Sequence, residues 1–391
     1  MLTLKLKPHE DRRLRAGHLW VYSNELETGP EFKTISPGTP CVVLDGRSKP
    51  LGLGYVNPHA LLSVRLLTSN TGAAIDGNWF ARRLRSAQAL REKLYGAPFY
   101  RLAFGESDGL PGLVMDRYGE VCVVQIGTAG MENLKGAIVD GLSQALAPRG
   151  ILFRNDVPAR ELEGLGSYIE AVGEVPEEIG IDEGGVKFRV SPRSGQKTGW
   201  FYDQRDNRER LARYVRGRTM LDVFSYAGGW AVRAAQSGAT AVTCIDSSQP
   251  ELDAAQRNAA LNGVALEAIR DDALDALKAL RAAGRTFDVV VVDPPALIKR
   301  KKDYEAGLEH YAALNRAAMH LLPEDGFLVA CSCSHHLEAD ALQRILLREA
   351  RTAGRRLQIV EQGAQAADHP VHPAIPETRY LKAFYCRVTK G

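Results

Sequence analysis

The second half of the chain alternates short apolar runs with segments of helical spacing. The runs occupy residues 219–224, 241–246, 266–270, 287–293, 326–333, 357–361 and 380–388. Between them, apolar positions recur every three or four residues, as in amphipathic helices. Residues 289–292 are all valine, which is typical of a central parallel strand covered on both faces. The alternation predicts a doubly wound α/β domain over residues 191–391.

The first half of the chain carries two different patterns. Residues 1–72 hold short alternating segments separated by Gly, Pro, Asn and Asp, which predicts an all-β domain. Residues 75–188 mix helical segments with strand-like runs, which predicts an α+β domain. A hairpin is expected at 178–190, across the end of this domain. The polar segment 191–210, SPRSGQKTGWFYDQRDNRER, then leads into the third domain. Such a segment is either a ligand cover or a linker with an aromatic anchor.

Composition adds limits but no function. A chain of 391 residues with 45% hydrophobic and 25% charged residues is typical of a multidomain globular protein. The net charge of +3 does not by itself demand a nucleic acid partner. The six cysteines lack framework spacing, which predicts free thiols in a reducing cytoplasm. No stretch approaches the roughly 18 apolar residues of a membrane span, so no membrane partner is expected.

Residues 218–246 are expected to form a strand, a sharp turn, a helix and a second strand. Asp222 lies in the first strand, Gly228 in the turn, and Asp246 ends the second strand. An acid at that position suits a ribose hydroxyl pair, in either a nicotinamide nucleotide or S-adenosylmethionine (SAM). No G-x-G-x-x-G follows any expected strand, which favours SAM. An ordinary tight turn without a ligand remains the alternative.

Other strands of this domain also end in polar or reactive groups, where ligands bind in this architecture. Asp271 and Asp272 end the third strand, Asp293-Pro294-Pro295 the fourth, and Ser332-Cys333-Ser334 the fifth. Two prolines after an acid make a stiff corner, from which a carboxylate can address the Watson–Crick edge of a flipped base. The alternative is a simple strand terminator.

The two cysteines of the fifth strand, Cys331 and Cys333, indicate the reaction class. Residues i and i+2 share a strand face, so Cys333 should lie nearer the mouth of the site. A thiol there is a suitable nucleophile for C6 of a pyrimidine, whose C5 can then accept a methyl group. Two structural thiols are the alternative. A metal site with His335 and His336 is disfavoured because C-x-C-x-H-H lacks zinc-site spacing.

Two basic segments, residues 12–15 and 299–302, suit RNA binding, in which phosphate attraction and base stacking combine. A solvated charged surface is the alternative reading for both segments. The candidate RNA-binding residues are Arg12, Arg13, Arg15, Lys299, Arg300, Lys301 and Lys302.

With these residues in view, the chain resembles the bacterial large-subunit (23S) rRNA 5-methylcytosine methyltransferases of the RlmI-like class I SAM-dependent family. The resemblance rests on the blocks GHLWVYSNEL, SGQKTGWFYDQRDNR, LDVFSYAGGWAV, VVDPPAL, SCSHHL and QAADHPVHPAIPETRYLKAFYCRV. It implies an N-terminal, β-barrel-like PUA domain over 1–72, a central α+β domain over 75–188, and a Rossmann-like SAM domain over 191–391.

The resemblance also implies roles for single residues. Cys333 would be the nucleophile, and Asp293 would hydrogen-bond the cytosine and border the cofactor. The SAM-binding set would be Gln196, Lys197, Arg205, Asp222, Phe224, Tyr226, Gly228, Asp246, Asp272 and Asp293.

One departure concerns product release. Many RNA cytosine-C5 enzymes place a second cysteine just after the proline of the fourth-strand motif, whereas Ala296 and Leu297 follow Pro295 here. Three hypotheses therefore stay open: a 23S rRNA cytosine-C5 methyltransferase, a SAM-dependent N-methyltransferase acting on a purine, and a non-catalytic RNA-binding or ribosome-assembly factor. A homodimer is compatible with the sequence.

Overall fold

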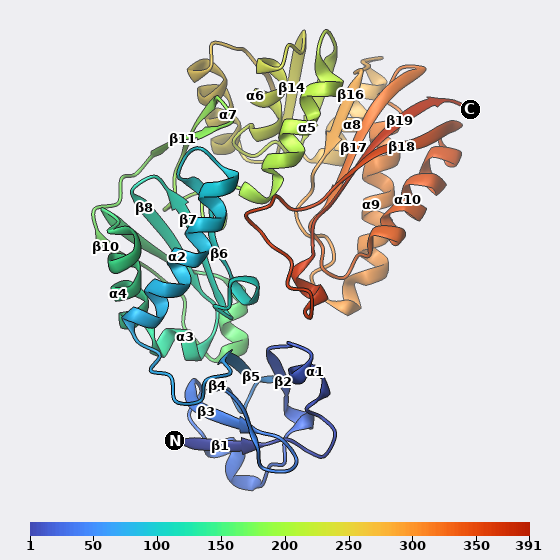
Figure 1. Ribbon diagram of the computed structural model, residues 1–391. Coiled ribbons are helices and arrows are strands. Elements are labelled where there is room, and N and C mark those ends of the chain that lie inside the picture. Colours follow the sequence, from blue (N-terminus) through green and yellow to red (C-terminus); the bar gives the residue numbers. More distant parts are fainter. The chain divides into compact units, whose positions relative to one another are not determined.

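The computed structural model describes all residues from Met1 to Gly391. The chain divides into two compact units. Figure 1 labels the helices and strands along the chain. The first unit contains residues 1–179, 190–202 and 367–378, and the second contains residues 180–189, 203–366 and 379–391. Each unit is described by itself below.

The first unit begins with a small five-stranded sheet that has the order β1-β3-β4-β5-β2. Its strands are β1 (Leu2–Lys5), β2 (Trp20–Tyr22), β3 (Thr39–Leu44), β4 (Pro50–Val56) and β5 (Leu62–Thr68). Alternate side chains of these strands, among them Leu4, Val21, Val43 and Val64, form one buried core. The predicted all-β domain is confirmed apart from the short helix α1 (Arg12–Arg15) and two 3-10 helical segments at Ser23–Glu25 and Pro30–Thr34.

A second sheet of the first unit has the order β10-β9-β8-β7-β6. Its strands are β6 (Phe99–Phe104), β7 (Leu113–Tyr118), β8 (Val121–Ile126), β9 (Gly150–Asn155) and β10 (Tyr168–Gly173). The helices are α2 (Gly77–Leu94), α3 (Ala129–Asn133) and α4 (Lys135–Leu146). Asp76 caps α2 by accepting a hydrogen bond from Trp79 N at 2.9 Å. The apolar side chains of α2, including Phe80 and Leu84, are buried against this sheet.

The second unit is built on a seven-stranded sheet of order β15-β14-β13-β16-β17-β19-β18. The strands are β13 (Thr219–Val223), β14 (Ala241–Asp246), β15 (Glu267–Arg270), β16 (Val289–Val292), β17 (Asp325–Ser332), β18 (Arg355–Gly363) and β19 (Lys382–Lys390). All seven strand predictions are confirmed. The five strands from β15 to β17 are parallel, and β19 runs antiparallel to β17.

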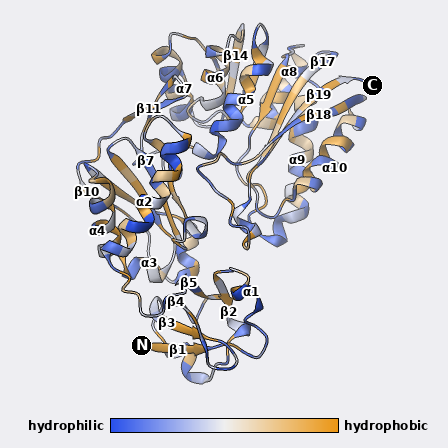
Figure 2. Cartoon of the chain, viewed as in Figure 1, coloured by the Kyte–Doolittle hydropathy of each residue, from blue (hydrophilic) through white to orange (hydrophobic).

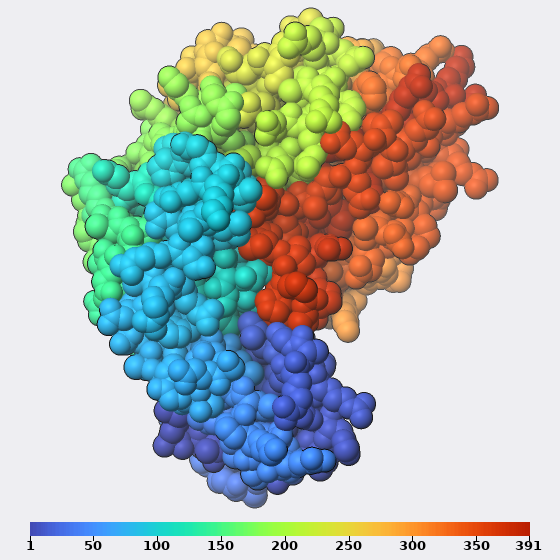
Figure 3. All heavy atoms as spheres, viewed as in Figure 1, coloured from blue at the N-terminus to red at the C-terminus, as the bar shows by residue number.

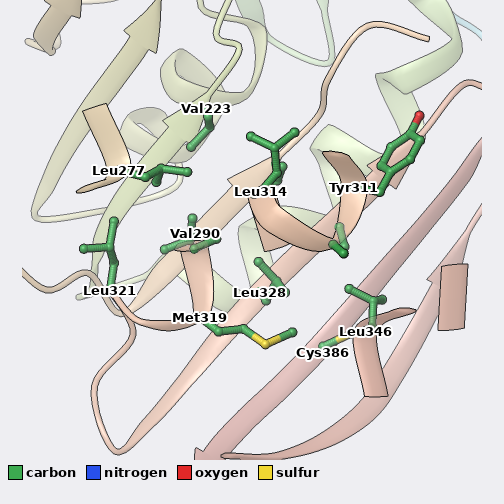
Figure 4. Close-up of a cluster of buried hydrophobic side chains, with 14 of the residues drawn as sticks. Val223, Leu277, Val290, Tyr311, Leu314, Met319, Leu321, Leu328, Leu346 and Cys386 are labelled. Carbon is green, nitrogen blue, oxygen red and sulfur yellow. The ribbon is translucent and has the colours of Figure 1, made fainter. Parts of the chain in front are cut away.

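Helices cover both faces of this sheet. One face packs against α5 (Arg205–Val215), α6 (Gly229–Gln236) and α7 (Gln249–Leu261), where Val289 and Val291 join the core. The other face packs against α8 (Ala273–Ala282), α9 (Tyr304–Met319) and α10 (Ala339–Thr352), where Val290 and Val292 point. The predicted doubly wound arrangement is therefore confirmed. Figure 4 shows the second core, in which Val290 and Leu328 from the sheet meet helix side chains such as Leu314.

The hydropathy of the chain follows these layers. The central strands of the seven-stranded sheet are mostly hydrophobic, and the surrounding helices change from hydrophobic to hydrophilic around their circumference (Figure 2). The edge strand β18 belongs to the orange-to-red part of the chain that reaches the surface in Figure 3, and it exposes Ile359 and Val360. None of the helices combines the length and the apolar sequence that crossing a bilayer requires.

The expected boundaries at 188 and 191 need correction. The hairpin β11 (Ile179–Glu183) and β12 (Val186–Val190) groups almost entirely with the second unit, because backbone N–H groups of β12 donate to Asn258 on α7 and to Asn262, which follows α7. Arg189 N donates to Asn258 Oδ1 at 2.7 Å. Conversely, residues 191–202 and 367–378, expected in the third domain, group with the first unit. The sequence of a polar segment does not reveal which distant part of the same chain it will pack against.

Candidate active site

Four parallel strands bring the candidate residues to one edge of the second unit's sheet. Strands β14, β13, β16 and β17 are successive neighbours, with Asp222 opposite Cys244 on one side and Val291 on the other. Because parallel strands end at the same edge, the residues that follow them gather there. The sequence prediction that polar groups at these strand ends share one region is therefore confirmed.

The turn after β13 has an unusual backbone. Phe224 and Tyr226 have φ angles of 68° and 48°, and Gly228 has 82°, so three of five successive residues are left-handed. For residues with a Cβ this conformation is strained and must be held by surrounding contacts. The N–H groups of Phe224 and Ser225 both donate to Ile245 O at 3.0 Å. Tyr226 N donates to Asp246 Oδ2 at 2.9 Å. The turn is thus fixed to the end of the adjacent strand.

Gly228 has a structural reason to be glycine. A Cβ at this position would lie 2.9 Å from Ala255 Cβ and 3.1 Å from Ala255 Cα on α7. Its left-handed φ adds a second penalty for any larger residue. The small residue therefore lets the start of α6 approach α7 closely. A contact between Gly228 and the cofactor remains a prediction.

Asp222 carries a fully buried carboxyl group that has no ion-pair partner. Its Oδ2 accepts a hydrogen bond from Ala231 N at 3.1 Å, and its Oδ1 is buried without any partner. Burial, and then the charge of Asp293, raise the pKa of Asp222 to about 8. Ser225 Oγ is also buried and unpartnered. Buried polar atoms without partners are rare and indicate a ligand or water that would satisfy them.

Asp246 is held by backbone donors at the end of β14. Its Oδ2 accepts from Tyr226 N and its Oδ1 from Ser248 N, both at 2.9 Å. Nearby, burial and the charge of Asp246 raise the pKa of Glu251 on α7 to about 7. Asp272 has a different role, because its Oδ1 caps α8 by accepting from Leu274 N at 2.9 Å. The helix cap alone explains the position of Asp272, and its contact with SAM stays a prediction.

Asp293 is held by two neutral donors that the sequence analysis did not identify. Gln204 Nε2 donates to its Oδ1 at 2.9 Å, and Trp230 Nε1 donates to its Oδ2 at 3.0 Å. Burial raises the pKa of Asp293 to about 6, although the Trp230 hydrogen bond opposes the rise. Trp230 lies in the block LDVFSYAGGWAV and Gln204 in the block SGQKTGWFYDQRDNR, and membership of these blocks was the only sequence signal for either residue.

The two cysteines differ as predicted. Cys331 is 1% exposed, and burial raises the pKa of its thiol well above the usual value. Cys333 is partly exposed and follows the last residue of β17. Its Sγ lies 3.9 Å from the carbonyl oxygen of Pro294, the residue after Asp293. The structure thus brings the loop with Asp293 against the thiol of Cys333.

Hydroxyl groups fix the chain on either side of Cys333. Ser332 Oγ donates to Tyr311 OH at 2.9 Å, and Tyr311 OH is 2.9 Å from Ser334 Oγ. Ser334 Oγ in turn accepts from Ile298 N at 3.1 Å. This network joins the end of β17 to α9 and to the loop after β16.

The remaining predicted SAM-binding residues lie elsewhere in the two units. Arg205 is buried in the second unit with its Nε 3.8 Å from Glu183 Oε2, an acid that Arg208 also binds through two hydrogen bonds. Gln196 and Lys197 belong to the segment that groups with the first unit. Lys197 is left-handed, with φ 52°, and its Nζ lies 4.9 Å from the ring centre of Phe201. The part of all three residues in cofactor binding stays a prediction.

The candidate RNA-binding residues fall into two groups. Arg13 forms an ion pair with Glu25 at 2.5 Å, Arg15 pairs with Asp11 and Asp45, and Arg300 pairs with Asp303. Their charge is therefore partly neutralised. Glu25 and Asp45 lie 12 and 30 residues from their arginines, where local spacing does not reveal a pair, whereas Asp11 and Asp303 are close in sequence and were overlooked. The exposed residues without an ion pair are Arg12, Lys299, Lys301 and Lys302.

Known proteins resemble the chain along most of its length. Residues 166–387 match the S-adenosylmethionine-dependent methyltransferase family, and residues 4–69 match the PUA-like domain. A Klebsiella pneumoniae protein named Ribosomal RNA large subunit methyltransferase I is 39% identical over 98% of each chain. A Shewanella denitrificans protein of the same name is 39% identical over 99% of each chain.

Solved structures share the fold. A crystal structure of SMU.776, described as a methyltransferase candidate complexed with SAH, has a TM-score of 0.85 and 20% sequence identity. The alignment covers 99% of this chain and 100% of that one. A Streptococcus mutans structure described in similar terms has a TM-score of 0.83.

Proposed function

The chain belongs to the S-adenosylmethionine-dependent methyltransferases and, among them, to the Ribosomal RNA large subunit methyltransferase I family, and on that basis we propose that it makes 5-methylcytosine in 23S rRNA. The proposed route is a transient covalent bond between Cys333 and C6 of the target cytosine. The observation that supports it is the partly exposed thiol beside the loop of Asp293, at the mouth of a SAM fold.

The residues of the second unit fit SAM. Asp222 Oδ1 is a buried acceptor without a partner and suits a cationic or hydrogen-bond-donating part of the cofactor. Asp246, held in place by two backbone donors, suits the ribose hydroxyls. When bound, SAM supplies an electrophilic methyl group that becomes bonded to the target base.

Cys333 would start the reaction as a nucleophile. Its thiolate adds to C6 of cytosine, and the electron pair of the C5–C6 double bond moves to C5, which becomes nucleophilic. After methylation, the C5 proton passes to solvent, its electron pair restores the C5–C6 double bond, and the C6–S bond breaks to release the thiolate. Cys331, deeper in the same strand, cannot replace it, because burial keeps its thiol protonated.

Asp293 would recognise the ring of the cytosine. With a pKa of about 6, its carboxyl group exchanges a proton near neutral pH. It can therefore donate to ring N3 or accept from the 4-amino group. Gln204 and Trp230 would fix its orientation through one hydrogen bond each.

The PUA-like match and the exposed cations without ion pairs support RNA as the substrate. We propose Arg12, Lys299, Lys301 and Lys302 as phosphate contacts, and we assign Arg13, Arg15 and Arg300 a smaller share because each has a carboxylate partner. Each lost phosphate contact should reduce the salt dependence of RNA binding.

A second candidate is methylation of a purine nitrogen, which needs no thiol. It is favoured by the absence of a second cysteine after Pro295, where Ala296 and Leu297 stand. Nucleoside analysis of methylated rRNA separates the two candidates, because the products differ in base and position.

The deciding experiment compares Cys333→Ala with Cys331→Ala on hypomethylated 23S rRNA and labelled SAM. Cys333→Ala should lower cytosine methylation by about 10³-fold or more while SAM binding remains. Cys331→Ala, which alters a buried thiol of the same strand, should retain most of the activity. Normal cytosine methylation by Cys333→Ala would refute the covalent route, and methylated purines alone would favour the second candidate.

A further inference from the structure

A buried lysine lies beside the candidate nucleophile. Lys382, the first residue of β19, is 8% exposed. Its Nζ donates to the carbonyl oxygen of Ser334 at 2.7 Å, and no carboxylate oxygen lies within 4.0 Å of it. Lysines are rarely buried without an acidic partner. The position therefore needs a reason other than an ordinary ion pair.

The register of the sheet places Lys382 against the segment that carries Cys333. Strand β19 runs antiparallel to β17, and Lys382 is the partner of Ser332. The side chain then reaches forward to the carbonyl group of Ser334. Lys382 thus contacts the chain on both sides of Cys333, and the charge of the Cys333 thiol acts on the pKa of Lys382.

The other titratable groups around Cys333 come from several elements. Asp293 follows β16, Tyr311 lies on α9, Cys331 lies on β17, and His335 and Glu338 follow β17. The charge of Cys333 acts on the pKa of Tyr311, Cys331 and Lys382. The ring of His335 stacks on Tyr380 with 5.3 Å between the centres. Lys382 supplies the ammonium group of this set.

The electrostatic balance at Lys382 fits a charged partner. Burial lowers the pKa of Lys382 to about 8, and the negative charges of Cys333 and Glu338 oppose that shift. Lys382 therefore keeps its proton at neutral pH. An ammonium group near a thiol favours the ionised sulfur, which is the form that attacks an electrophile.

We propose that Lys382 is a positioning residue whose ammonium group holds Cys333 as the thiolate needed for attack on cytosine C6. The inference rests on the proposed function. The thiol proton passes to solvent, Lys382 keeps its own proton, and the two side chains remain as an ammonium–thiolate pair. Lys382 acts through Cys333 and need not touch the substrate.

The test measures the ionisation of Cys333 without RNA or SAM. The full-length protein reacts with iodoacetamide over a range of pH, and mass spectrometry of peptides follows carboxamidomethylation of Cys333. The other five cysteines are buried, so they should react far more slowly. Lys382→Gln removes the charge but keeps a donor, whereas Lys382→Arg keeps the charge. Lys390→Gln, at an exposed position of the same strand, is the control.

Lys382→Gln should react about tenfold more slowly than the wild type at pH 7, and the two rates should converge near pH 10, where both thiols are ionised. Lys382→Arg should restore most of the rate, and Lys390→Gln should not change it. A Lys382→Gln profile that coincides with the wild-type profile would overturn the inference.

Titration of Cys333 in the wild-type protein tests the inference even if the Lys382 variants do not fold. The wild-type Cys333 should titrate clearly below the reference thiol pKa of about 8.5. A wild-type value at or above that reference overturns the inference without any variant. Failure of the proposed function is separate, because it appears as cytosine methylation by Cys333→Ala, which alkylation rates do not measure.

Discussion

The two units treat buried charge differently. In the first unit, buried arginines bind carboxylates directly: Arg91 pairs with Asp108 at 2.6 Å, and Arg160 pairs with Glu132 at 2.8 Å. At the strand ends of the second unit, Asp222 and Asp293 are bound only by neutral donors. Their pKa values rise to about 8 and about 6, mainly because of burial.

This difference separates charges that serve the fold from charges that serve a site. A buried pair with good hydrogen bonds holds two chain segments together at modest net cost. A buried carboxylate without a cation costs stability, and such groups cluster at functional sites. The strained turn through Phe224 and Tyr226 lies at the same strand ends. Away from these strand ends, buried charged residues of the second unit also form ion pairs, as Arg208 does with Glu183.

The largest effect is expected from breaking a structural pair. Arg91→Met leaves the carboxylate of Asp108 buried without its cation, and the free energy of unfolding of the first unit should fall by about 3–5 kcal/mol. Hydrogen exchange of peptides from α2 and β6 measures the loss within that unit. The double variant Arg91→Met/Asp108→Asn should recover much of it. Equal exchange in Arg91→Met and wild type would contradict the structural assignment.

Asp222→Asn should raise the free energy of unfolding at high pH, whereas Arg91→Met lowers it. Because the folded pKa of about 8 lies above the usual 3.8, the native state holds the proton that the unfolded state releases. The stabilising contribution of Asp222 is full below pH 4 and is lost as pH rises through 8. Asparagine does not titrate, so the free energy of unfolding of the variant should not show this loss. Between pH 5 and pH 9, the variant should become more stable than the wild type by roughly a few kcal/mol. Urea unfolding at both pH values checks this, and a parallel response of the two proteins would contradict it.

Asp293→Asn should separate activity from stability. Removal of the titrating group should lower methyl transfer on the order of 10²-fold, because proton exchange with the base is lost. The free energy of unfolding should stay the same or rise, since the variant lacks a partly buried charge that desolvation disfavours. Single-turnover methylation and urea unfolding measure the two quantities. A large loss of stability would place Asp293 with the structural carboxylates of the first unit.

Asp246→Asn should have the smallest effect. The loss of a charged acceptor should weaken SAM binding about tenfold, as followed by calorimetry. Asp253→Asn, at an exposed position on the neighbouring helix α7, serves as the matched control and should bind SAM normally. Unchanged SAM affinity in Asp246→Asn would remove this residue from the cofactor site.

Much of the second unit's fold and candidate site could be predicted from local sequence. The valine run of β16 and the acids after successive strands predicted the doubly wound sheet and the edge where its polar groups meet, since both depend on neighbours along the chain. The spacing of Cys331 and Cys333 also predicted which thiol is buried. These features follow from the two-residue period of a strand.

The missed features depend on distant contacts. Trp230 and Gln204 hold Asp293 from positions 63 and 89 residues away, and no local spacing reports such a bond. Lys382 appears as an ordinary strand residue until the pairing of β19 with β17 is known. The close approach of Gly228 to Ala255 on α7 likewise appears only in the folded structure.

The central claim is that Cys333 bonds to the base it helps to methylate. An RNA substrate with 5-fluorocytidine at the target position should trap that bond, because fluorine cannot leave C5 as a proton does. Incubation with SAM should give a protein–RNA adduct that peptide mass spectrometry maps to Cys333, and Cys333→Ala should give none. Cytosine methylation by the wild type with no such adduct, or with the adduct on another residue, would contradict the account.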